Sequence, residues 1–201
     1  SSGVVSAHDP IEIQLVHTPE QAIDLNQPIE ETLFEISPEV KGKTIWSDQN
    51  TITFIPETPL KSGQKYWVKF NLGAVLKVDK ELETFKFPLE TVQQAIDFES
   101  DGLIAYNNNS IKWQQYHGKV VTADRISEEE LNEAFEIKYR DQSVAAQWEQ
   151  RSDRIYTMII DSIQRFDTEQ QLNIQWSGQS INAQGAGAEK VTVPALGDFK
   201  V

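Results

Sequence analysis

The sequence predicts an all-β protein built from two antiparallel β-sandwich domains in tandem, with one short helix in the second domain. Short stretches of alternating apolar and polar residues recur along the 201-residue chain, and this period of two is that of a half-buried strand. Turn-forming residues separate these stretches at intervals of roughly 8–12 residues, which is typical of antiparallel sandwiches rather than of βαβ units. The pattern is complete by about residue 91 and then begins again, so we expect domains over residues 1–91 and 92–201.

Six stretches in the first half have the strand pattern. They are Ile11–Leu15, Leu33–Ile36, Thr44–Ser47, Thr51–Ile55, Gln64–Leu72 and Phe85–Leu89. The residues Asp48, Gln49 and Asn50 separate the third stretch from the fourth and predict a hairpin turn. Pro56, Pro59 and Gly63 break the chain before the fifth stretch, so a Pro-rich turn is expected between two strands there.

The second half repeats this pattern around one helix. Its expected strands are Leu103–Tyr106, Trp113–Thr122, Val144–Trp148, Ile155–Ile163, Leu172–Trp176 and Val191–Val193, with a turn at Asn107–Asn109. Ser127 and Glu130 form an S-x-x-E capping box, which marks the start of a helix. Leu131, Ala134 and Phe135 follow at three- and four-residue spacing and predict its apolar face. Residues 184–188, Gln-Gly-Ala-Gly-Ala, are expected to form a loop.

The composition excludes several functions. A net charge of −13 argues against nucleic acid, because a protein that binds phosphates needs a basic stripe and the sequence has none. The absence of cysteine excludes disulfides, thiolate catalysis and cysteine-ligated zinc. No apolar run approaches the roughly 20 residues that a membrane-spanning helix needs.

The motifs that could carry chemistry are incomplete. Residues 97–102, Asp-Phe-Glu-Ser-Asp-Gly, imitate the start of a calcium-binding EF-hand loop, but the twelfth position is Asn108 where the loop needs Glu. A turn between strands is the expected role. His8, His17 and His117 have no metal-ligand spacing, and no G-x-S-x-G nucleophile motif occurs. We therefore expect no catalytic, cofactor-binding or metal-binding residues, and no enzyme.

One aromatic residue is a candidate for binding. If Tyr66, Val68 and Phe70 face the core, the alternation turns Lys65, Trp67 and Lys69 outward. An outward Trp67 between two lysines could stack on a sugar or pack against a neighbouring domain, and the second is the commoner use of an exposed aromatic. Lys65, Trp67 and Lys69 therefore form a possible interface. The other strand tryptophans, Trp113, Trp148 and Trp176, are interpreted as core residues or inter-domain anchors.

These segments also resemble a known family. Residues 51–56 (TITFIP), 59–63 (PLKSG) and 66–68 (YWV) resemble a bacterial Ig-like domain, in which a strand is followed by P-x-x-P-L-x-x-G and a Tyr-led strand. The second half is similar to the domain that follows in bacterial alpha-macroglobulin-like proteins. The matching pieces are residues 113–118 with 122–124, 163–165, 172–178 and 193–201.

The resemblance implies the N-terminal fragment of a longer, exported protein of the bacterial cell envelope, either periplasmic or anchored in the outer membrane as a lipoprotein. The opening Ser1-Ser2-Gly3, without an initiator Met, fits such an excerpt. Members of this family trap or inhibit proteases, and some carry a thioester that needs a cysteine. The resemblance thus implies a non-catalytic, monomeric scaffold whose partners are neighbouring domains of its own chain and, through the whole protein, proteases. A surface adhesin or glycan-binding module is the alternative.

Overall fold

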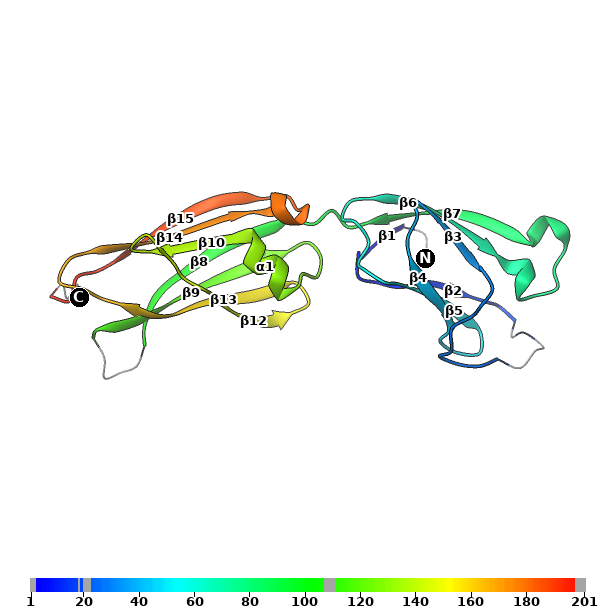
Figure 1. The fold of residues 1–201 in the computed structure, drawn as a ribbon, viewed down its shortest axis with the longest axis horizontal. Coiled ribbons are helices and arrows are strands. Elements are labelled where there is room, and N and C mark those ends of the chain that lie inside the picture. Colours follow the sequence, from blue (N-terminus) through cyan, green and yellow to red (C-terminus); the bar gives the residue numbers. More distant parts are fainter. Residues whose placement is uncertain (1–2, 18, 20–22, 107–110, 198–201) are drawn as a thin grey trace. The chain divides into compact units, whose positions relative to one another are not determined.

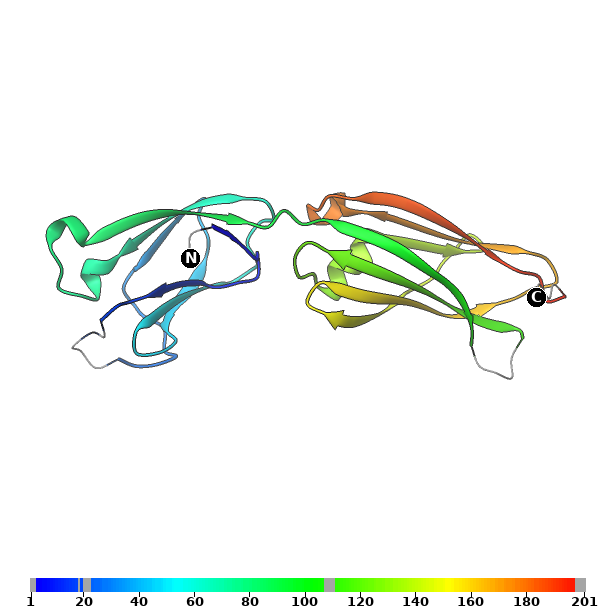
Figure 2. The same ribbon diagram turned by 180° about the vertical axis from the view of Figure 1, so that it is seen from behind.

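The structure is a computed structural model that describes residues 3–17, 19, 23–106 and 111–197, and it confirms the all-β prediction. The chain divides into two compact units, Ser1–Val92 (unit 1) and Gln93–Val201 (unit 2). Each unit contains two layers of mostly antiparallel strands, which Figure 1 shows from one side and Figure 2 from behind.

Unit 1 pairs a four-stranded sheet with a three-stranded sheet. The strands are β1 (Gly3–Val5), β2 (Ile11–Gln14), β3 (Phe34–Ser37), β4 (Gly42–Trp46), β5 (Thr51–Pro56), β6 (Lys65–Asn71) and β7 (Thr84–Thr91). Short 3-10 turns, η1 (Leu72–Ala74) and η2 (Lys80–Leu82), lie between β6 and β7. The sheet orders are β1-β7-β6-β3 and β2-β5-β4, and β1 joins β7 in parallel. Residues such as Ile52, Val68 and Phe70 fill the core between the sheets with less than 1% of their surface exposed.

The Pro-rich turn between β5 and β6 carries the chain from one sheet to the other, because β5 pairs with β2 and β4 while β6 pairs with β3 and β7. Leu60 in this turn is buried and its backbone N–H donates to the carbonyl of Ala7. The buried hydroxyl of Thr91 donates to the carbonyl of Lys61 at 2.6 Å and accepts from the N–H of Gln64 at 2.9 Å. The turn is therefore fixed to the end of β7.

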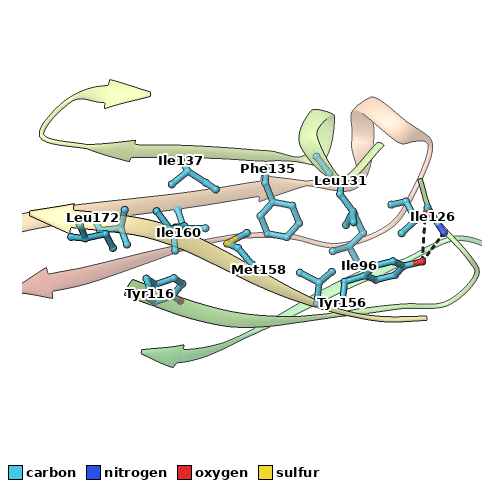
Figure 3. Close-up of a cluster of buried hydrophobic side chains, with 14 of the residues drawn as sticks. Ile96, Tyr116, Ile126, Leu131, Phe135, Ile137, Tyr156, Met158, Ile160 and Leu172 are labelled. Atoms are coloured by element: carbon cyan, nitrogen blue, oxygen red, sulfur yellow. Dashed lines mark hydrogen bonds between the residues drawn. The ribbon is translucent and has the colours of Figure 1, made fainter. Parts of the chain in front are cut away.

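Unit 2 contains two four-stranded sheets. Its elements are β8 (Ile96–Ala105), β9 (Trp113–Thr122), α1 (Glu128–Ala134), β10 (Phe135–Tyr139), β11 (Gln142–Ser143), β12 (Gln147–Ser152), β13 (Ile155–Gln164), β14 (Gln170–Ser177), η3 (Gly178–Ile181) and β15 (Ala186–Val193). The sheet orders are β12-β13-β9-β8 and β11-β10-β14-β15. Figure 3 shows Tyr116, Met158 and Ile160 of the first sheet opposite Ile137 and Leu172 of the second, all of them buried.

The helix starts where the capping box predicts and ends earlier than its apolar spacing predicts. The Ser127 Oγ accepts from the backbone N–H of Glu130 at 3.2 Å, and the Glu130 carboxylate accepts from the Ser127 N–H at 2.9 Å. Phe135, expected on the helix, instead has extended backbone angles and begins β10. Its ring packs against Phe98, Trp148 and Trp176 in the core, so tertiary packing overrides the helical spacing.

Two further expectations were wrong. Residues 97–102, expected as a turn, lie inside β8, which tolerates them through a bulge between Ser100 and Gly102, where Gly102 has a φ of +93°. Ala186, Gly187 and Ala188, expected in a loop, lie in β15 and pair with β14. The strands β1, β10 and β11 were also not predicted. The expected Asn107–Asn109 turn and Asn108 lie outside the described residues.

Candidate binding surface on unit 1

The outer face of the β3-β6-β7 layer carries the candidate residues from the sequence. Tyr66 and the core residues Val68 and Phe70 point inward with 4%, 0% and 0% of their surface exposed, while Trp67 is 60% exposed. The strand β6 has a hydrogen-bonded partner on each side, so the backbone beneath Trp67 is held in place from both directions.

The register of the sheet decides which side chains surround Trp67. Directly opposite residues on neighbouring antiparallel strands point to the same face. Trp67 therefore lies between Ser37 of β3 and Pro88 of β7. In the next row of side chains, Lys69 lies between Glu35 of β3 and Lys86 of β7. We call Glu35, Ser37, Trp67, Lys69, Lys86 and Pro88 the Trp67 face.

The positive charges of the Trp67 face are only partly compensated. The Lys69 Nζ lies 2.7 Å from the Glu35 Oε1. Lys86, directly opposite Lys69, is exposed, and none of the residues that the structure describes forms an ion pair with it. Lys65 lies in the row on the other side of Trp67, where its Nζ is 3.7 Å from the Glu90 Oε2. Exposed pairs of this kind contribute about 0–1 kcal/mol each, so they leave the lysines free to exchange partners.

A hollow of about 330 Å³ lies beside these side chains. It is lined by Glu35, Ile36, Ser37, Trp67, Val68, Lys69 and Lys86. The structure thus brings Trp67 and Lys69 together at one hollow and leaves Lys65 outside its lining. Sequence reasoning missed Glu35 and Lys86, because only the pairing of β6 with β3 and β7 brings them to this face.

The remaining candidates do not converge on a site. His8 and His17 are exposed, and His117 is half-buried on β9. Within residues 3–17, 19, 23–106 and 111–197, no group of three or more His, Asp or Glu side chains could hold a metal ion. Trp148 and Trp176 pack against the core of unit 2, and the Trp148 Nε1 donates to the Asn132 Oδ1 at 2.9 Å.

A larger hollow of about 580 Å³ lies against the outer side of unit 2, near the start of β10. Small residues of β15 (Ala186, Gly187 and Ala188) form part of its wall. Of its acidic rim residues, Glu136 is already paired with Lys138 at 2.5 Å. The aromatic residue that lines this hollow, Trp176, is half-buried and packs against the core of unit 2, whereas Trp67 is exposed. In the part of the chain that the structure describes, no helix is long and apolar enough to cross a bilayer.

The geometry thus defines an all-β protein of two sandwich units with an aromatic and basic surface on the first. The chain matches no protein-family model and no curated protein. Among solved structures, an endo-fucoidan hydrolase of glycoside hydrolase family 107 is similar at a TM-score of 0.26 and 11% identity, over 83% of this chain and 24% of that enzyme. The chain spans about a quarter of that enzyme's length, and a likeness this weak carries no argument about function.

Proposed function

We propose that the chain is a non-catalytic scaffold segment, in which two self-supporting β-sandwiches act as spacers within a larger surface protein. The observation that carries this proposal is that each unit closes its own hydrophobic core. Among the residues that the structure describes, fourteen buried apolar residues of unit 1 and fifteen of unit 2 form separate clusters. A protein that needs length gains it by adding domains of this kind in series.

The junction between the units supports the same proposal. The Val92 N–H donates to the carbonyl of Val5 at 2.9 Å and its carbonyl accepts from Gly63 at 3.1 Å, so Val92 belongs to the sheet region of unit 1. Two residues later, the buried side chain of Gln94 donates to the carbonyl of Asp124 and accepts from its N–H in unit 2. The hydrogen bonding of each unit therefore extends to the junction, in contrast to a long Gly/Ser-rich linker.

The proposal extends to the setting that the sequence resemblance implies. We place the chain in a bacterial envelope protein of the alpha-macroglobulin type, exported and lipid-anchored, with protease trapping as the activity of the whole protein. The support is the order of the motifs within residues 51–68 and 113–201. In this setting the Trp67 face is a contact for a neighbouring domain of the same chain.

The gene sequence on both sides of this segment tests the setting. A lipid-attachment cysteine shortly before Ser1 and a series of further β-domains after Val201 are the expected result. A stop codon directly after Val201 would contradict the proposal that the chain belongs to an alpha-macroglobulin-type protein. If the further domains are present, a protease that cleaves the full-length protein should stay bound to it, and the two should migrate together as one complex. The control is a full-length variant with a mutation in the segment that the protease cleaves, which should not form this complex.

A glycan-binding surface module is the second candidate. The specific observation in its favour is the hollow beside the exposed Trp67, since a partly apolar hollow with a few polar groups is the usual form of a small-ligand site. Binding on a glycan array that disappears with Trp67→Ala would favour this candidate. If no glycan on the array binds, the result would favour the spacer proposal.

A further inference from the structure

We propose that the Trp67 face binds an acidic saccharide, with a sugar ring stacked on the Trp67 indole and its carboxylate held between Lys69 and Lys86. This inference rests on the glycan-binding candidate and names the chemical class of its ligand. It is the alternative to a neighbouring-domain contact at this face, and it goes beyond the spacer role, which requires no ligand.

The aromatic part of the site is accessible, and the backbone beneath it is paired on both sides. Trp67 is 60% exposed, while its chain neighbour Val68 is fully buried and anchors the strand from below. Pro88, directly opposite Trp67, adds a second apolar surface beside the indole. The indole is a large, flat, partly apolar surface with a polar N–H, and the C–H face of a pyranose ring is the matching flat surface on a sugar.

The charged part of the site selects an anion. Lys69 and Lys86 are directly opposite on β6 and β7, a pairing in which Cβ atoms lie about 4.5–5.5 Å apart and like charges repel. Glu35 neutralises one of the two lysines at 2.7 Å. One positive charge therefore remains at this place in a chain whose net charge is −13. A carboxylate between the two ammonium groups would relieve their repulsion and accept charge-assisted hydrogen bonds from both.

The geometry favours a saccharide over an acidic peptide. Peptides that bind to sheets usually add a strand at an unpaired edge, whereas Trp67, Lys69 and Lys86 lie on the broad face of the inner strands β6 and β7. The hollow of about 330 Å³ lies at the lower end of the range of small-molecule sites. Ser37 and Glu35 on its wall can form hydrogen bonds with sugar hydroxyl groups.

The test compares a short oligogalacturonate with its fully methyl-esterified form, titrated calorimetrically into the whole chain. The acid form should bind, and the neutral ester should bind about tenfold more weakly, as expected for the loss of a charge-assisted contact. Trp67→Ala should abolish measurable heat, and Lys86→Gln should weaken binding of the acid by about tenfold while leaving the ester unchanged. Lys119→Gln is the matched control, because Lys119 is an exposed lysine in an ion pair with Glu99 on a strand of unit 2. Circular dichroism checks that each variant folds.

Each alternative outcome has a definite meaning. If acid and ester bind equally and both need Trp67, the glycan-binding candidate stands and the acidic ligand is wrong. If neither sugar binds, or if binding does not change with Trp67→Ala, the acidic-saccharide site is wrong, the glycan array decides the wider glycan-binding candidate, and the spacer proposal is unaffected. If polyglutamate binds as tightly as the uronate, the face attracts anions in general and the saccharide is not its ligand.

Discussion

Gly187 of β15 lies directly against the indole of Trp176 of β14. The two residues are cross-strand partners, and a Cβ atom placed on Gly187 would lie only 2.3 Å from the Trp176 Cζ2. Trp176 in turn packs against Phe98, with ring centroids 5.0 Å apart, and against Phe135. The Trp176 indole therefore occupies the space that a side chain at position 187 would need, and the aromatic packing of unit 2 requires glycine there.

Gly187→Ala should destabilise unit 2 by about 1–3 kcal/mol, the usual cost of forcing an extra methyl group into a packed region. Urea denaturation followed by circular dichroism measures the change in the free energy of unfolding. Gly197→Ala is the matched control in the same unit, because a Cβ atom on Gly197 would meet nothing within 4 Å. Equal stability of the two variants would show that Trp176 moves aside at no cost.

The same glycine shows why part of the fold could not be predicted. Residues 184–188 have the composition of a loop, and only the presence of Trp176 on the neighbouring strand explains small residues in β15. Phe135 is the converse case, since it fits the helical spacing yet begins a strand because its ring has aromatic partners far away in the sequence. By contrast, the alternation in β6 and the capping box of α1 are local patterns, and both were predicted correctly.

Some residues of the Trp67 face could likewise be predicted from the local sequence pattern, and others could not. The period of two places Trp67 and Lys69 outward without knowledge of any partner strand. Glu35 and Lys86 are 34 and 17 residues away from Lys69 in sequence, and they become its neighbours only through the register of β3 and β7. Register depends on turns and on the whole core, so a single sequence cannot specify which charges meet.

Arg165 forms hydrogen bonds with backbone carbonyls of two segments of unit 2 that are far apart in the sequence. It is only 8% exposed, and its guanidinium donates to the carbonyls of Ile111 at 3.0 Å, Pro194 at 2.9 Å and Ala195. Arg165→Met should destabilise unit 2 by about 2–4 kcal/mol, because the substitution leaves carbonyl groups without the charged donor. Thermal unfolding in a calorimeter measures the loss.

The comparison variant is Arg151→Met. Arg151 is an exposed residue of the same unit that pairs with Glu149, and exposed pairs contribute about 0–1 kcal/mol. A loss of stability for Arg165→Met no greater than that for Arg151→Met would mean that water replaces the three contacts. Arg165→Lys should lie between the wild type and Arg165→Met, since one ammonium cannot reach three carbonyls in the planar arrangement of a guanidinium.

The β4–β5 hairpin should weaken in acid. The backbone N–H of Asn50 donates to the Asp48 Oδ1 at 2.8 Å, and this hydrogen bond, followed by one from the Thr51 hydroxyl, lowers the pKa of Asp48 below its ordinary value of 3.8. Because the folded-state pKa lies below the unfolded value, the stabilisation is complete above the unfolded pKa and is lost as the pH falls through the folded one. The stability advantage of the wild type over Asp48→Asn should therefore shrink between about pH 6 and about pH 2.5. An advantage that stays constant over this range would contradict the assignment.

Tyr116 should make unit 2 sensitive to alkali. Burial raises the pKa of its phenol above 10.0, although its hydrogen bond to the Ser100 Oγ at 2.8 Å acts in the opposite direction. The folded state therefore holds the phenolic proton more tightly than the unfolded state does. The resulting stabilisation is complete below the unfolded pKa and is lost as the pH rises through the folded value. The difference in unfolding free energy between the wild type and Tyr116→Phe, measured by urea denaturation at about pH 8 and about pH 11, should change in favour of the phenylalanine variant at the higher pH. The same difference at both pH values would show that the Tyr116 hydroxyl reaches water and ionises in the folded chain as readily as in the unfolded one.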